Sequence, residues 1–301
     1  MSLITGLTLA ESGARTYTVQ VPDRPVTASV PVIIVFHGGG QDSRTIAARW
    51  GVDPPNPLPS PLEDYLLVFP ETDPGMGEEW VHFQAGDSKF PTLDLEFVRR
   101  LLTELTTTSY PTGSASVPTV SADPELIYAA GFSNGGGMVW QLLNSALSTA
   151  FRGFAAVGKA LDPEKARHYR TELAETGAVP APAPVVYVHG TADRGFRPPL
   201  TVDETDLGTT LPAFTCLEML ERNGISRDVP ANARLAPGST GITEVVVQLF
   251  EGEAAFLMAT VINGGHNWPT PTTRGNPPVA EHFDATATIV TFWQQHAGLP
   301  N

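Results

Sequence analysis

The pentapeptide Gly131-Phe132-Ser133-Asn134-Gly135 fits the pattern G-x-S-x-G, which marks a serine nucleophile when it joins a strand to a helix. The apolar residues 126–130 predict a buried strand before it, and residues 134–146 predict a helix after it. Glycines leave room for such a sharp turn, where larger side chains would collide with the backbone. With 28 glycines in the chain the pattern also arises by chance, so its meaning depends on partner residues elsewhere.

A serine nucleophile needs a base to accept its proton and an anion to orient that base. We predict His266 as the base, because it follows an expected strand and two glycines. We predict Asp193 as the acid, because it comes directly after an earlier expected strand. Asp203 and Asp206 are the alternatives for the acid, and the loop residue His82 is the alternative for the base. A surface histidine and a structural turn aspartate are the simpler interpretations of the preferred pair.

The run His37-Gly38-Gly39-Gly40 follows an apolar stretch at residues 30–36 that predicts a strand covered on both faces. Glycines there allow the backbone to approach a developing alkoxide and to direct an amide N–H at it. We predict Gly39 as one oxyanion donor, with Gly38 and Gly40 as alternatives. The backbone N–H of Asn134, directly after the serine, is the expected second donor.

Aromatic residues near these loops could contact a substrate through stacking and apolar surface. Trp268 lies two residues after His266, and Trp80 lies in a loop that follows the strand expected at residues 65–69. We expect both side chains, together with His37, Gly38 and Gly40, to line the substrate cleft. For Trp80 the alternative is simple packing under the long loop.

The elements that would position these residues alternate between strands and helices. Such alternation predicts an α/β fold with a mostly parallel central sheet flanked by helices, and function then gathers in loops at the carboxyl ends of the strands. We expect one domain over residues 1–301 and no large lid domain. The expected strands are 15–21 at an edge, 30–36, 65–69, 126–130, 153–158, 185–188, 244–250 and 256–262, and the expected helices are 95–105, 134–146, 164–175, 211–222 and 280–296.

The composition of the 301 residues is that of a globular chain, with 42% hydrophobic and 17% charged residues. A net charge of −14 argues against nucleic acid or an anionic membrane as a partner. A single cysteine, Cys216, excludes an intrachain disulfide, and the seven histidines show no metal-ligand pattern, so we expect no metal and no cofactor.

No apolar run is long enough to cross a bilayer, and the first ten residues lack the basic region of a signal peptide. A cytoplasmic location is therefore slightly favoured, and export with a leader absent from this chain is the alternative. The oligomeric state is left open.

Four motifs together carry a resemblance to a known family: residues 37–40, residues 131–136, His189-Gly190-Thr191-Ala192-Asp193, and Gly265-His266-Asn267-Trp268-Pro269. The resemblance covers roughly residues 15 to 297, and it is to the α/β-hydrolase superfamily and, within it, to the polyhydroxybutyrate depolymerase and feruloyl esterase group. The resemblance implies a catalytic triad of Ser133, Asp193 and His266. It also implies ester substrates such as hydroxyalkanoate polyesters, cinnamoyl esters of plant polysaccharide, or acetylated xylan.

The expected activity is therefore that of a serine carboxylic ester hydrolase that works through an acyl-enzyme, on a small-molecule or oligomeric ester. Because this chain shows no appended substrate-binding module, soluble oligomers or small esters are favoured over solid polymer. A peptidase or amidase of the same fold is the first alternative, since a triad alone does not exclude it. A catalytically silent binding protein is the second, and the complete set of triad residues argues against it.

Overall fold

The computed structural model of the chain describes residues 2–9, 15–22, 25, 27–52, 62–77, 79–80, 91–175, 181–193, 210–228, 232–235, 244–270 and 282–300. Strands and helices alternate along most of this length. The strands are β1 (Ser2–Leu9), β2 (Arg15–Val21), β3 (Ser29–Phe36), β4 (Leu66–Pro70), β5 (Tyr110–Pro111), β6 (Thr119–Phe132), β7 (Gly153–Val157), β8 (Val185–Gly190), β9 (Asn232–Leu235), β10 (Val245–Phe250) and β11 (Phe256–Val261). The helices are α1 (Ser43–Arg49), α2 (Pro91–Thr107), α3 (Asn134–Leu143), α4 (Pro163–Glu175), α5 (Leu211–Arg222) and α6 (Ala285–His296), with short 3-10 turns at Leu62–Asp64, Pro74–Met76 and Ala146–Ala150.

One twisted sheet joins these strands in the order β1-β2-β4-β3-β6-β7-β8-β11-β10-β9, with β5 paired to β6 beside this path. The central strands β4, β3, β6, β7, β8 and β11 are all parallel, and the pairs at both sides of them are antiparallel. Because β3, β6, β8 and β11 are parallel, their carboxyl ends meet at one edge of the sheet. The loops that carry the predicted site residues leave from that edge.

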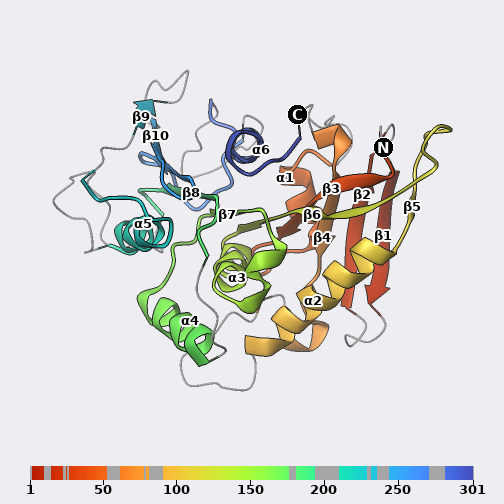
Figure 1. Cartoon of the computed structure of the whole chain (residues 1–301), viewed down its shortest axis with the longest axis horizontal. Coiled ribbons are helices and arrows are strands. Elements are labelled where there is room, and N and C mark those ends of the chain that lie inside the picture. Colours follow the sequence, from red (N-terminus) through yellow and green to blue (C-terminus); the bar gives the residue numbers. More distant parts are fainter. Residues whose placement is uncertain are drawn as a thin grey trace.

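Helices cover both faces of the sheet, α1 and α6 on one and α2, α3, α4 and α5 on the other (Figure 1). Alternate residues of β3 divide between the two layers: Ile34 and Phe36 pack toward α2 and α3, and Ile33 and Val35 pack toward α1 and α6. A strand buried on both faces has to be apolar throughout, which explains the uninterrupted apolar run at this point.

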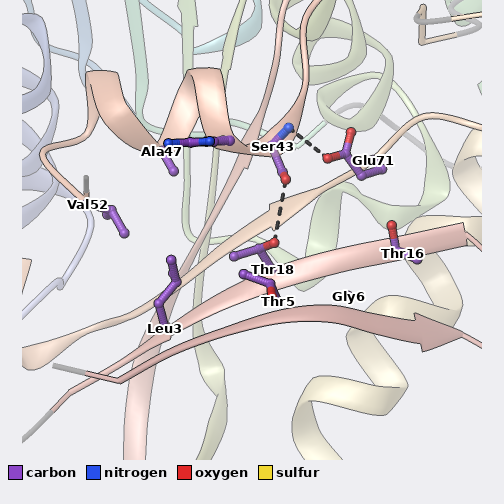
Figure 2. Close-up of a pocket in the computed structure, with 10 residues that line it drawn as sticks. Leu3, Thr5, Gly6, Thr16, Thr18, Ser43, Ala47, Val52 and Glu71 are labelled. Atoms are coloured by element: carbon purple, nitrogen blue, oxygen red, sulfur yellow. Dashed lines mark hydrogen bonds between the residues drawn. The ribbon is translucent and has the colours of Figure 1, made fainter. Parts of the chain in front are cut away.

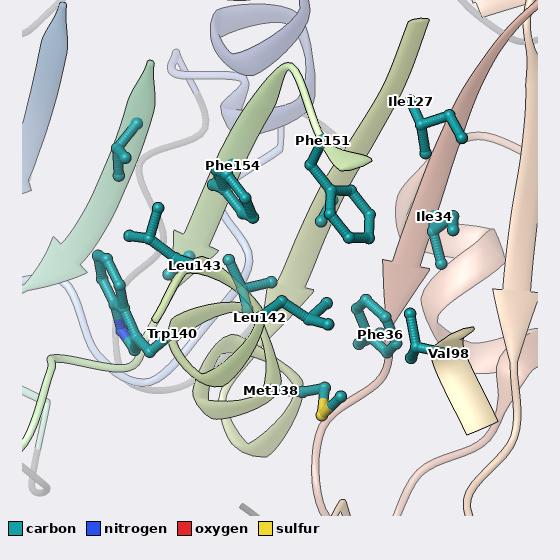
Figure 3. Close-up of a cluster of buried hydrophobic side chains, with 14 of the residues drawn as sticks. Ile34, Phe36, Val98, Ile127, Met138, Trp140, Leu142, Leu143, Phe151 and Phe154 are labelled. Carbon is teal, nitrogen blue, oxygen red and sulfur yellow. The ribbon is translucent and has the colours of Figure 1, made fainter. Parts of the chain in front are cut away.

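Helix α3 lies in the centre of the larger core cluster (Figure 3). Met138 and Leu142 point toward the sheet, where Phe36 and Phe154 lie on β3 and β7. All of α3 from Gly135 to Leu143 is buried. The helix that starts at the predicted nucleophile is therefore held by packing along its whole length, and its first residues have little freedom to move.

The expectation of an α/β-hydrolase sheet flanked by helices, without a large lid in the described part of the chain, is confirmed. Several details differ from the sequence-based expectations, which also did not include β1, β5 or β9. The strand at 15–21 is not at the edge, because β1 pairs outside it. The strand before the serine begins earlier, at Thr119, and helix α1 was not predicted.

Candidate active site

Ser133 lies at the turn between β6 and α3, in a backbone conformation with φ 53° and ψ −116°. Positive φ is costly for a serine, and such strain persists where the surrounding structure enforces it. Here the backbone N–H of Ser133 donates to the carbonyl oxygen of Val157, at 2.8 Å, which ties the turn to β7. A β-carbon on Gly131 would lie 2.2 Å from the carbonyl oxygen of Gly135, so a side chain there has no space. These constraints hold the serine hydroxyl at the edge of the sheet.

Ser133, His266 and Asp193 form a hydrogen-bonded chain. The Nδ1 atom of His266 lies 2.6 Å from Asp193 Oδ2, and its Nε2 atom lies 2.8 Å from Ser133 Oγ. An ionised carboxylate can only accept, so Nδ1 carries the ring proton and Nε2 is left to accept the proton of the serine. The structure thus brings together the three residues that the sequence analysis predicted as nucleophile, base and acid.

The loops that carry Asp193 and His266 are bound to one another. The N–H of Ala192 donates to the carbonyl oxygen of Gly264 at 2.8 Å, and the N–H of Asn263 donates to Thr191 Oγ1 at 2.8 Å. Since β8 and β11 are also neighbouring parallel strands, the acid and the base are held by the same pair of strands. Their separation is therefore set by the sheet rather than by flexible loops.

Burial differs sharply along the chain of three residues. The Asp193 side chain is 4% exposed, whereas that of His266 is 44% exposed. The carboxylate is screened from water while the imidazole edge remains open to an incoming substrate. The ring of His266 packs on Phe132, the residue before the serine, with the ring centroids 5.0 Å apart.

His189 lies below the acid, at the end of β8, and is 2% exposed. Burial lowers the pKa of His189 to about 4, although the charge of Asp193 acts in the opposite direction. Its Nε2 atom lies 2.9 Å from Thr260 Oγ1, and its ring stacks on Tyr187. A neutral, packed His189 therefore supports the strand end from which Asp193 projects.

The glycine loop after β3 places its three glycines in different situations. The N–H of Gly38 donates to Gln41 Oε1 at 3.3 Å, and the N–H of Gln41 donates back to the carbonyl oxygen of Gly38 at 3.2 Å. This interaction occupies the Gly38 amide. Gly39 faces the serine turn, since a β-carbon on it would lie 3.6 Å from Asn134 Cβ. Of the three candidates, Gly39 is thus the one next to the second predicted donor.

Asn134 also contacts the segment that follows β4. Its Oδ1 accepts from the backbone N–H of Trp80 at 2.6 Å, and its Nδ2 donates to the carbonyl oxygen of Trp80 at 3.3 Å. The indole Nε1 of Trp80 donates to the carbonyl oxygen of His37 at 3.0 Å. Trp80 therefore links the glycine loop at His37 to the serine turn at Asn134, the two segments that carry the predicted oxyanion donors.

Three residues expected to contact substrate have different positions in the structure. Trp80 and Trp268 are 2% and 1% exposed, and His37 is fully buried. Trp268 packs against Trp50 and Phe132, and its Nε1 donates to Thr286 Oγ1 at 3.0 Å. The expectation that these side chains line the cleft is corrected: both indoles complete the hydrophobic core and leave no free face for stacking. His37 instead bonds through Nδ1 to the carbonyl oxygen of Gly38, at 2.8 Å.

Two contacts around the glycine loop were missed from the sequence. Gln41, directly after the glycines, accepts from Arg49 Nη1 at 3.0 Å as well as from Gly38. The guanidinium of Arg49 lies over the ring of Phe132, 4.4 Å from its centroid, and burial lowers the pKa of Arg49. The position of Gln41 directly after the glycines was a signal in the sequence for the first contact. The contact of Arg49 could not be predicted, because helix α1 was not predicted.

A cavity of about 500 Å³ lies away from Ser133, between α1 and strands β1 and β2 (Figure 2). Glu71 and Ser43 line it, and the backbone N–H of Ser43 donates to Glu71 Oε1 at 2.9 Å. The other carboxylate oxygen of Glu71 lies 3.5 Å from His37 Nε2. The cavity is therefore connected to the glycine loop only through Glu71, and Ser133 is not among the residues that line it.

The alternatives Asp203, Asp206 and His82 lie outside the described residues. Within the described part of the chain, no group of three or more histidine, cysteine, aspartate or glutamate side chains could hold a metal ion. In the same part, no helix has the length and apolar character needed to span a membrane. Cys216 is buried on α5, and burial raises the pKa of its thiol to about 11.

The strand order, the flanking helices and the turn at Ser133 define the α/β-hydrolase fold, and the first of two similar solved structures supports this assignment. The acetyl xylan esterase from Aspergillus awamori superimposes with a TM-score of 0.53 at 12% identity, over 88% of this chain and 94% of that chain. The poly(3-hydroxybutyrate) depolymerase LpqC from Bordetella parapertussis aligns over 99% of this chain and 89% of that chain, with a TM-score of 0.49 and 16% identity.

A sequence comparison finds a relative described as "Putative esterase NocK", from Nocardia uniformis subsp. tsuyamanensis. It is 27% identical over 269 residues, which cover 84% of this chain and 70% of the relative. No model of a known protein family matches the chain. The resemblance to esterases of the α/β-hydrolase type, first drawn from four motifs, is confirmed by these similarities.

Proposed function

We propose that the chain is a serine carboxylic ester hydrolase. The observation that carries the proposal is the hydrogen-bonded chain from Asp193 through His266 to Ser133, with contacts of 2.6 and 2.8 Å. A serine hydroxyl at the apex of a strained turn, in contact with a histidine that a buried carboxylate orients, is the arrangement needed for acyl transfer. The similarity to esterases supports an ester as the substrate.

The reaction proceeds in two halves. Ser133 Oγ attacks the ester carbonyl while His266 Nε2 takes the hydroxyl proton, and the N–H groups of Gly39 and Asn134 stabilise the oxyanion. The C–O bond to the alcohol then breaks, and His266 gives its proton to the departing alkoxide. In the second half, water attacks the acyl-enzyme with His266 as the base, which releases the acid and restores Ser133.

The substrate class follows from the resemblance. Hydroxyalkanoate oligomers or polyesters and feruloyl-type esters are the proposed substrates, with acetylated xylan as a further member of the panel. Hydroxybutyrate oligomers, methyl ferulate and acetylated xylan, compared by kcat/KM on the same preparation, would separate them. A matched series of amides and peptides tests the peptidase or amidase alternative.

The proposed function is tested by labelling and by burst kinetics. A fluorophosphonate should modify Ser133, and p-nitrophenyl butyrate should give a burst of p-nitrophenol equal to the concentration of active sites. The Ser133→Ala variant should lose both signals and retain the wild-type melting temperature within a few degrees. Turnover of the ester by Ser133→Ala at the wild-type rate would overturn the assignment.

A further inference from the structure

Glu79 places a carboxylate beside the predicted oxyanion hole. A β-carbon built on Gly39 would lie 3.3 Å from Glu79 Oε1 and 3.6 Å from Asn134 Cβ. Since a carbon–carbon bond is about 1.5 Å long, the Glu79 carboxylate lies within about 5 Å of the Gly39 α-carbon. It is therefore close to both of the residues whose amides are proposed to hold the oxyanion.

The backbone around Glu79 is held firmly. The next residue, Trp80, is buried, and its N–H donates to Asn134 Oδ1 at 2.6 Å. The Trp80 indole donates to the carbonyl oxygen of His37. Glu79 is thus attached through Trp80 to the serine turn at Asn134 and to the glycine loop at His37, the two segments that supply the proposed oxyanion donors.

Glu79 is exposed, and within the described part of the chain no ion pair or hydrogen bond of its side chain is found. By contrast, Glu71, also after β4, binds the N–H of Ser43. A negative charge next to a developing oxyanion raises the energy of the transition state unless the substrate compensates for it.

We propose that Glu79 is a specificity residue that accepts a hydrogen bond from a hydroxyl or ammonium group of the substrate, near the scissile carbonyl, and disfavours anionic substrates. This inference rests on the proposed ester hydrolase function and refines its substrate class. An ionised carboxylate has no proton to donate, so it attracts hydroxyl and ammonium groups and repels a second carboxylate. A difference in apolar contact between two paired esters is the same in the wild type and in a variant, so the change in their rate ratio reports the carboxylate.

Three pairs of esters test the proposal, and the hydrolysis of each is followed by titration of the released acid at pH 7.5. Methyl 3-hydroxybutyrate is compared with methyl isovalerate, which replaces the hydroxyl by a methyl group. Monomethyl succinate, an anion, is compared with methyl valerate, which is neutral. The glycerol monoester of butyric acid is compared with propyl butyrate, so that a donor on the alcohol side is separated from a donor on the acyl side.

The test variant is Glu79→Gln, which keeps the size of the side chain and removes its charge. Relative to its neutral partner, monomethyl succinate should gain roughly three- to tenfold in kcat/KM, the effect of removing one charge that water screens from the substrate carboxylate at about 4–5 Å. One of the two hydroxyl-bearing esters should lose its advantage by a similar factor. Added salt should weaken the discrimination against the anion in the wild type and have little effect in Glu79→Gln.

Glu63→Gln is the matched control, because Glu63 is also an exposed glutamate and lies before β4 rather than after it. It changes the net charge by the same amount and should keep every wild-type ratio. Equal ratios in the wild type, Glu79→Gln and Glu63→Gln would overturn the role of Glu79 while leaving the ester hydrolase intact. A protein that hydrolyses none of these esters and is not labelled at Ser133 would overturn both proposals.

Discussion

Gly135 packs directly against the backbone of Phe36, the last residue of β3. A β-carbon on Gly135 would lie 2.2 Å from the carbonyl oxygen of Phe36 and 2.5 Å from that of His37. The helix that begins after Ser133 therefore touches the strand that leads into the glycine loop, with no side chain between them. This contact sets the distance between the predicted nucleophile and the predicted oxyanion donors.

Gly135→Ala should consequently damage both stability and activity. The backbone carbonyls cannot rotate away as a flexible side chain could, so α3 must shift, at a cost of about 1–3 kcal/mol in the free energy of unfolding. Urea unfolding and ester turnover measure the two effects. Gly75→Ala is the control: its new β-carbon would meet only Asp73 Oδ1, at 3.2 Å, and stability should change by less than about 0.5 kcal/mol. Equal stabilities of the two variants would show that α3 has room to move.

Asp193→Asn should leave the fold intact and lower kcat by roughly 10⁴, because an amide at this position no longer selects the tautomer of His266 that carries its proton on Nδ1.

His266→Ala should lower kcat by about as much as Ser133→Ala. The double variant Ser133→Ala/His266→Ala should be no slower than either single variant, since residues that act as a unit are strongly non-additive. Effects that multiply would show that the two side chains act independently.

Arg49→Met should weaken catalysis without a large loss of stability. Arg49 holds Gln41, and Gln41 binds the Gly38 N–H, so its removal loosens the glycine loop. We expect a fall in kcat of roughly tenfold, within the range that small misplacements produce. Arg44→Met, on the same helix and exposed, removes the same charge at a position without this link and should keep the wild-type kcat.

His189 should make stability depend on pH. Its pKa is lowered by burial from 6.5 to about 4, so between these values the unfolded chain binds a proton that the folded chain does not. Stability therefore falls as the pH falls through this window, by about 2 kcal/mol between pH 7.5 and 5. Urea unfolding of the wild type and of His189→Gln at both pH values measures the difference. Identical pH dependence in the two proteins would contradict a buried neutral imidazole.

Local patterns in the sequence predicted most of the strands and helices and the residues of the candidate site. The apolar run of β3 was readable because a strand covered on both faces must be apolar at every position. The short α1 was missed, as was the position of β1 outside β2, because a helix of one or two turns and an edge strand carry little periodic signal. That the chain forms one domain stays a prediction.

The aromatic residues show where pattern-based inference ends. Trp80 and Trp268 were expected at the cleft because they lie close in sequence to loops at the carboxyl edge of the sheet. The structure buries both, since a tryptophan next to a loop can as readily point inward, where its ring fills core volume and its N–H finds an acceptor. The direction in which a side chain points is decided by packing, and the distance between two residues along the sequence does not reveal it.

The sequence by itself determined the residue types that make acyl transfer chemically possible and their order along parallel strands: a serine between glycines, then an acid, then a histidine, each after an apolar run. Only the tertiary structure decided which glycine faces Asn134, that Gln41 and Arg49 hold the loop, and that Glu79 lies beside it. The physical reason is that local pattern sets strands and turns, whereas contacts between segments tens of residues apart depend on how the sheet twists and how the helices pack against it.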